Sequence, residues 1–162
     1  MPNNDPALIQ FLSHLTMCAP LTQREVDVFL DYCEPVDIKK GDIIADIGEV
    51  GDVLYFVVKG EAGLYHDDGS QEIELTRVRE GELMGEMSFF DRNPRQVRMR
   101  AVQGNARLLK LTRPLYERLR IEHPYIAVNL LEYAIVSLDR MFRRVSDNVA
   151  NYSRYLFATG KK

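Results

Sequence analysis

The sequence lacks the features that mark several large classes of protein. Its 162 residues include only two cysteines, Cys18 and Cys33, which do not form the short spaced pair of a metal or redox motif. We expect them to be small buried side chains in a reducing compartment. The histidines, His14, His66 and His123, are scattered through the chain, so no metal site is expected.

Long apolar runs are also missing. The stretch from Ala7 to Leu15 is broken by polar residues, and no run approaches the roughly 18 apolar residues that a membrane span requires. No signal peptide is visible. The net charge of −3 and the sequence pI of about 5.7 argue against a general affinity for nucleic acid or an acidic membrane. We therefore expect a cytoplasmic protein that binds neither DNA nor a membrane.

The chain divides into three segments by the period of its apolar residues. Residues 1–35 predict N-terminal helices, one of which begins at Thr22 with Glu25 in the position of a capping box. Residues 36–112 predict a β-rich domain, and residues 113–162 predict C-terminal helices.

Short strand-like runs alternate with glycines in the middle segment. The pair Asp68-Gly69 lies between two of these runs and is a strong hairpin signal. Evenly spaced short strands with glycine corners are typical of a roll, barrel or sandwich. The runs that predict strands are 42–47, 53–58, 62–66, 71–78 and 106–112.

The C-terminal segment predicts a short helix followed by a long one. Thr112 and Pro114 are typical of a helix start, and that helix should end near His123. The long helix, at about 125–157, exceeds what so small a roll can cover. Its apolar residues alternate in steps of four and three, which predicts an a/d seam and a homodimer. A helix folded back on its own roll could use the same stripe. The seam residues are Leu138, Phe142, Val145, Val149, Tyr152 and Leu156.

Residues that suit an anionic ligand are concentrated between 81 and 101, in GELMGEMSFFDRNPRQVRMRA. Gly85 allows the backbone to approach a ligand closely. The next residues can form a helical turn whose first N–H groups, including those of Met87 and Ser88, can receive an anion. Arg95 offers a planar fork to phosphate oxygens.

Glu86 is the unusual member of this segment, because a carboxylate repels a phosphate. Its presence is explained if the ligand also carries a hydroxyl donor, such as a ribose 2′-OH. A phosphate and a ribose hydroxyl together indicate a nucleotide. The alternative is an ordinary surface ion pair between Glu86 and Arg95, which contributes little. The glycines around the two residues favour the ligand role.

A longer ordered set of motifs surrounds this segment: KGDII at 40–44, Gly48, LYFVVKG at 54–60, Gly81-Glu82, Gly85-Glu86, Pro94-Arg95 and Ala101. Over roughly residues 22–157 the chain resembles the cyclic-nucleotide-binding domain family, which includes protein kinase A regulatory subunits and the bacterial catabolite activator. The resemblance implies an α+β fold: a jelly-roll-like β-roll with N-terminal helices and a long C-terminal helix. It also implies that Glu86 binds the ribose 2′-OH and Arg95 the cyclic phosphate. The spacing of Glu86 and Arg95 is similar to that in the kinase subunits.

The chain departs from the family pattern directly after the arginine. Gln96 and Val97 stand where small residues are usual. Their N–H groups are available, but their side chains could crowd the phosphate. Gln96 also replaces the hydroxyl residue that is common in guanine-preferring members, which favours cAMP over cGMP.

The same alignment suggests residues for the base pocket. Leu64 and Leu75 are expected to point at the base from the roll. Val145, Ser146 or Val149 could cover the base as a lid, although the spacing of these residues fits a core or seam role equally well.

The leading hypothesis is a sensor that binds a cyclic nucleotide and acts through an unidentified downstream protein. No nucleophile with a nearby base is evident, so we expect no catalytic residues, no catalytic cofactor and no enzymatic activity. One alternative is a degenerate nucleotide-binding fold that serves as a dimeric interaction module. Another is the sensor part of a Crp/Fnr-type transcription regulator without its DNA-binding domain, because only residues 158–162 follow the seam.

Overall fold

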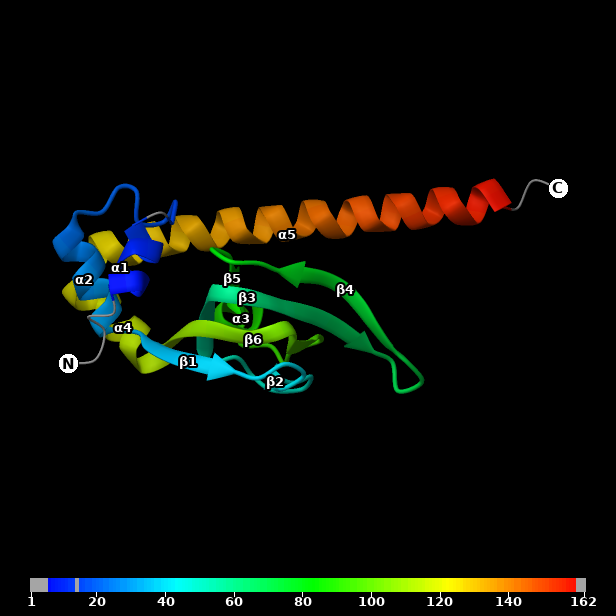
Figure 1. Cartoon of the computed structure of the whole chain (residues 1–162), viewed down its shortest axis with the longest axis horizontal. Coiled ribbons are helices and arrows are strands. Elements are labelled where there is room, and N and C mark those ends of the chain that lie inside the picture. Colours follow the sequence, from blue (N-terminus) through cyan, green and yellow to red (C-terminus); the bar gives the residue numbers. More distant parts are fainter. Residues whose placement is uncertain (1–5, 14, 160–162) are drawn as a thin grey trace.

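The computed structural model describes residues 6–13 and 15–159. Two N-terminal helices precede a curled antiparallel sheet, and two further helices follow it (Figure 1). The elements in chain order are α1 (Pro6–Ser13), α2 (Gln23–Asp31), β1 (Glu34–Ile38), β2 (Ile43–Ala45), β3 (Val53–Asp67), β4 (Glu72–Val78), β5 (Leu83–Met84), α3 (Glu86–Asp91), β6 (Arg98–Thr112), α4 (Arg113–Glu122) and α5 (Pro124–Thr159).

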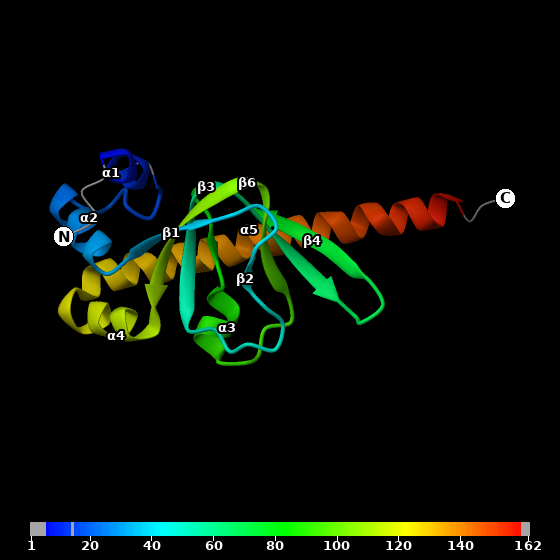
Figure 2. The ribbon, with the colours of Figure 1, turned by 60° about the horizontal axis from the view of Figure 1, so that its bottom comes forward.

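The sheet is organised around its two longest strands, β3 and β6, which pair with each other over most of their length. The strand order is β1-β6-β3-β4, with β2 paired to β6 and β5 paired to β3, and every pairing is antiparallel. Figure 2 shows the sheet curled into a roll, with α3 at the lower end of the roll in this view. The expected fold class, a β-roll with N-terminal helices and a long C-terminal helix, is confirmed.

Strand β3 joins two runs that the sequence predicts as separate strands, 53–58 and 62–66. Gly60 lies between them with φ of 85°, and the register with β6 shifts on both sides of it. A Cβ atom at this position would come within 3.1 Å of the Ala106 Cα atom. Glycine therefore lets the strand bend closely over its neighbour without ending it.

The helix signals in the sequence are confirmed. The Thr22 N–H donates to a Glu25 carboxylate oxygen at 2.7 Å, and the Glu25 N–H donates to Thr22 Oγ1 at 3.3 Å, which completes the capping box. Helix α4 follows Thr112 and has Pro114 in its first turn. The long helix α5 lies along β5 and β4 and then extends past the roll (Figure 1).

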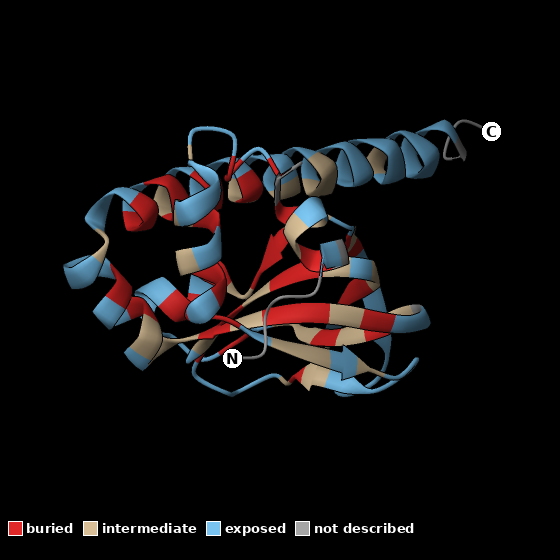
Figure 3. Ribbon diagram, turned by 60° about the vertical axis from the view of Figure 1, so that its left-hand side comes forward, coloured by how far each residue is buried: buried red, intermediate tan, exposed pale blue. Residues whose placement is uncertain are grey.

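Buried apolar side chains form two clusters. Figure 3 colours the buried residues of the ribbon red. One joins the N-terminal helices, α4 and the first half of α5 to one side of the roll, and it includes Phe29, Phe56, Phe89, Leu111, Leu119 and Leu130. The other fills the roll itself and includes Val57, Leu64, Met84, Met99 and Leu108. The second cluster includes two residues of the segment between 81 and 101, Met84 and Met99.

Candidate functional site

A cavity of about 270 Å³ opens where α3, the loop after it, the roll and α5 meet. This size is close to the lower end of small-molecule pockets, about 300–1,000 Å³. The cavity is lined by Leu64, Met84, Gly85, Glu86, Met87, Ser88, Asp91, Asn93, Pro94, Arg95, Gln96, Val97, Met99 and Met141.

The Arg95 side chain is buried at this cavity, with 9% of the residue exposed. Within the described part of the chain, its guanidinium makes no hydrogen bond and no ion pair. The main chain around it is held: the Arg95 N–H donates to the Glu49 carbonyl at 2.8 Å, and the Gly48 N–H donates to the Arg95 carbonyl at 2.9 Å. Burial lowers the pKa of Arg95, against the opposing charges of Tyr55, Glu49, Glu86 and Asp52. The site therefore holds a buried cation that lacks a protein partner.

Two glycines give the Arg95 side chain its room. A Cβ atom on Gly51 would lie 2.8 Å from Arg95 Nη2 and 2.9 Å from the Phe89 nitrogen. Gly85 has φ of 93°, and a Cβ atom there would lie 3.1 Å from the Val53 carbonyl oxygen and 3.4 Å from Arg95 Nη1. Both positions therefore require glycine for close packing, and Gly85 requires it for its backbone conformation as well.

The Ser88 hydroxyl connects α3 to two neighbouring loops. It accepts from the Gly51 N–H at 2.7 Å and donates to the Asn93 carbonyl at 2.6 Å. This side chain is therefore engaged within the protein, and its role in the cavity wall is to fix α3 against the neighbouring loops.

Glu86 is the first residue of α3 and is almost completely buried, with 2% of its surface exposed. Ser137 Oγ lies 2.9 Å from Glu86 Oε1 and 3.2 Å from the Leu83 carbonyl oxygen, and it can donate to either. Burial raises the pKa of the Glu86 carboxyl to about 7, although hydrogen bonds from its own N–H and from Ser137, together with the charge of Arg95, act in the opposite direction. Glu86 and Arg95 form no direct ion pair, so the surface-pair alternative does not describe them.

The two residues that depart from the family pattern make no hydrogen bond to the Arg95 side chain within the described part of the chain. Gln96 is exposed, and its side chain makes no hydrogen bond to Arg95. The N–H groups of Gln96 and Val97 donate to no acceptor among the described residues.

The remaining predicted residues are only partly brought together. Leu64 lies in the cavity wall, whereas Leu75 lies outside it and is 37% exposed on β4. In the bulged pairing of β3 and β4, Leu64 is opposite Thr76 and Tyr65 is opposite Glu74, which leaves Leu75 as the extra residue. The proposed lid residues, Val145, Ser146 and Val149, are also absent from the cavity wall.

Sequence reasoning missed a set of methionines. Met84, Met87, Met99 and Met141 line the cavity, out of six methionines in the chain, and of these only Met87 was selected from the sequence. Methionine is polarizable and adapts to flat apolar partners. Met141 is the contribution of α5 to the cavity wall, and no local sequence pattern connects it to the segment between 81 and 101.

The comparison with known proteins agrees with this geometry. The family model for the cyclic nucleotide-binding domain matches residues 35–123, more than half of the chain. The chain belongs to the cyclic nucleotide-binding domain family. The matched residues span most of the roll and every residue of the loop that carries Arg95.

Individual proteins are similar to this chain in sequence or in fold. The cyclic AMP receptor protein of Thermus thermophilus is 36% identical over 111 residues, which is 68% of this chain and 51% of that protein. The chain therefore spans about half the length of the curated relatives it matches. The Thermus thermophilus catabolite activator protein structure is 33% identical with a TM-score of 0.66, covering 88% of this chain and 63% of that one. A cyclic nucleotide-binding domain from Methylobacillus flagellatus reaches a TM-score of 0.79 at 20% identity, covering 91% and 83%.

Within residues 6–13 and 15–159, none of the helices has both the length and the apolar character needed to cross a membrane. The same residues contain no cluster of three or more histidine, cysteine, aspartate or glutamate side chains that could hold a metal ion.

Proposed function

We propose that this domain is a regulatory sensor that binds cAMP, in preference to cGMP, and has no catalytic activity of its own. The observation that carries the proposal is the pair of buried, mutually unpaired charges on one cavity. Arg95 lacks an anionic partner, and Glu86 lacks the exposed environment that a carboxylate normally requires. A cyclic phosphate supplies the anionic partner for Arg95, and a ribose hydroxyl supplies a hydrogen-bond donor for Glu86.

The rest of the ligand has a suitable environment. The base can pack against Leu64 and the methionine side chains of the cavity wall, which suit a flat aromatic ring. Gln96 offers no hydroxyl to a guanine, so we favour adenine. The name of the Thermus thermophilus relative, a cyclic AMP receptor protein, supports the same choice.

The test is calorimetry of the purified chain with cAMP and with cGMP. Arg95→Ala should weaken cAMP binding by about 1.5–3 kcal/mol, because it removes a charge-assisted contact to the phosphate. The matched control is Arg92→Ala, which removes an arginine from the same loop that is exposed and paired with Asp52 at 3.0 Å. Glu86→Gln should weaken cAMP binding less and leave binding of the 2′-deoxy analogue nearly unchanged.

One further variant, Gln96→Ala, distinguishes the cyclic-nucleotide sensor from the interaction module. If the Gln96 side chain occupies the phosphate position in solution, the unmodified chain will not bind and Gln96→Ala will bind. If neither chain releases heat with millimolar cAMP or cGMP, the sensor function is refuted and the interaction module is favoured.

We also propose that the sensor is a cytoplasmic homodimer that pairs through α5. Four of the seam residues, Phe142, Val149, Tyr152 and Leu156, are between 52% and 72% exposed, and Leu138 and Val145 are half-buried. The heptad also extends further back than the sequence analysis placed it. Val128 and Ile135, fourteen and seven residues before Phe142, are 50% and 67% exposed. An apolar repeat of this length on one helix favours a coiled-coil partner.

A further inference from the structure

Ser137 connects the cavity to α5. Only 8% of the residue is exposed, and its hydroxyl lies 2.9 Å from Glu86 Oε1, the nearer of its two acceptors, and 3.2 Å from the Leu83 carbonyl oxygen. Met141, one turn further along the same face of the helix, lines the cavity. The carboxylate at the bottom of the site is therefore held by a helix that lies more than fifty residues away in the sequence.

We infer that Ser137 is a positioning residue for the ligand site, which fixes one oxygen of the Glu86 carboxylate and leaves the other to accept a ligand hydroxyl. This inference rests on the proposed function, because it assigns Ser137 a role in reading the ribose. Glutamate has three side-chain torsions, so a buried donor that fixes one oxygen reduces the freedom lost when the ligand binds.

Titratable groups from three elements face Glu86. Arg95, in the loop after α3, lowers the pKa of Glu86, and Glu82, in the turn before β5, raises it. Tyr133 of α5 is a neutral neighbour whose own pKa is raised to about 12, mainly by burial. Glu82 is itself paired with Arg144 of α5 at 2.9 Å. Burial raises the pKa of Glu86 to about 7, and the Ser137 hydrogen bond is one of the contacts that lower it. Removing the hydroxyl should therefore raise the pKa of Glu86 further and leave more of it protonated at neutral pH.

The effect of removing the Ser137 hydroxyl should depend on whether the nucleotide carries a ribose 2′-OH. Ser137→Ala should weaken binding of cAMP at neutral pH by about three- to tenfold, the equivalent of one neutral hydrogen bond. Binding of 2′-deoxy-cAMP should be nearly unchanged, because that ligand has no hydroxyl for Glu86 to accept. In a Glu86→Gln background the Ser137→Ala change should have little further effect, because the two residues act as one unit.

The experiment is calorimetry with both nucleotides on four chains: unmodified, Ser137→Ala, Glu86→Gln and the double variant. Ser153→Ala, farther along α5, controls for a serine-to-alanine change on this helix. NMR titration of the Glu86 carboxyl in the first two chains, without nucleotide, should show a higher pKa in Ser137→Ala.

The outcomes separate the inference from the function on which it rests. If the unmodified chain does not bind cAMP, the proposed function and this inference both fail. If the unmodified chain binds and prefers the ribose, but Ser137→Ala binds both nucleotides as the unmodified chain does, only the inference fails. Equal weakening toward cAMP and 2′-deoxy-cAMP would indicate a merely structural serine and would also overturn it.

Discussion

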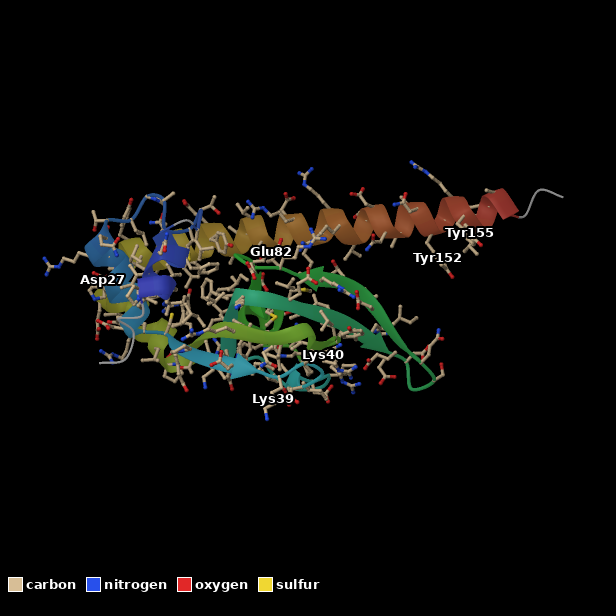
Figure 4. The ribbon with its side chains drawn as sticks, in the orientation of Figure 1. Asp27, Lys39, Lys40, Glu82, Tyr152 and Tyr155 are labelled. Atoms are coloured by element: carbon tan, nitrogen blue, oxygen red, sulfur yellow. The ribbon has the colours of Figure 1, made fainter. Side chains whose placement is uncertain are left out.

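The two halves of α5 differ in what surrounds them, although they form one continuous helix. The first half packs on the core through Ile126, Leu130, Tyr133 and Ala134, each at most 5% exposed. The second half extends past the roll, and Tyr152 and Tyr155 project from it with about two thirds of each residue exposed (Figure 4). The helix therefore combines a buried inner stripe, which ends near the cavity, with an outer apolar stripe that continues to its far end.

The change between the halves occurs where the inner stripe becomes polar. After Met141, the positions that face the roll are Arg144, which pairs with Glu82, and Asn148, which donates to the Leu75 carbonyl at 3.2 Å. Figure 4 shows Glu82 beneath the helix at this point. Polar contacts hold a helix in place without the burial that a core requires, so the apolar residues beyond them need another explanation than packing on this roll.

The largest expected effect is on assembly. Val149→Glu together with Leu156→Glu should abolish the proposed dimer, because both charges would be buried without partners. Sedimentation at tens of micromolar should show a dimer for the unmodified chain and a monomer for the variant. Asn151→Glu with Ala158→Glu adds the same charges at the same spacing on another face and should leave the dimer intact. A monomeric unmodified chain would contradict the assignment of the second half to dimerisation.

The same substitution in each half should have unequal effects on folding. Leu130→Ala, at a residue with no exposed surface, should lower the free energy of unfolding by about 2–5 kcal/mol through lost burial and a cavity. Leu156→Ala, at a residue that is 52% exposed, should lower it by less than about 1 kcal/mol. Urea unfolding at concentrations low enough to give monomers provides both values. Similar losses at the two positions would mean that the second half is packed in solution.

Glu86 of α3, which contacts the buried half of α5 through Ser137, should give folding a pH dependence. The pKa of Glu86 is raised to about 7 in the folded chain, so between about pH 4.5 and 7 the folded chain holds a proton that the unfolded chain releases. This group therefore makes the folded state less stable as pH rises through that window. Glu86→Gln removes the effect, so the variant should gain stability relative to the unmodified chain by on the order of 3 kcal/mol across the window.

Urea unfolding at several pH values measures this difference. Glu132→Gln, at an exposed position of α5, should show a difference from the unmodified chain that stays constant over the same range. A constant difference for Glu86→Gln as well would mean that Glu86 is more solvated than its burial implies.

The features that sequence reasoning found are those set by neighbouring residues. The capping box at Thr22, the hairpin at Asp68-Gly69 and the start of α4 each depend on a few consecutive positions. The segment with Glu86 and Arg95 is likewise short, and the structure brings the two residues to the same cavity.

The elements and cavity residues that sequence reasoning missed depend on contacts between residues far apart in the sequence. Strands β1 and β5 have weak local patterns and exist through pairing with β6 and β3. The predicted strand at 106–112 omits the first half of β6, where Arg98 and Arg100 pair with Asp46 and Glu72 from distant parts of the chain. Ser137 and Met141 reach the cavity only because α5 crosses it, and no local signal connects them to Glu86.

The smallest expected effect compares two adjacent arginines at the boundary between the halves. Arg144 donates to both oxygens of Glu82, and the two side chains are 30% and 16% exposed. Arg143 pairs with Asp139 one turn away on the solvent side, where the side chains are 75% and 55% exposed.

Arg144→Gln should lower the free energy of unfolding by about 1–2 kcal/mol, because it leaves a half-buried carboxylate without its donor. Arg143→Gln should change it by less than about 0.5 kcal/mol, since exposed pairs along a helix are screened by water. Equal changes in urea unfolding would show that the polar contacts do not hold α5 to the roll and that the buried half alone fixes its direction.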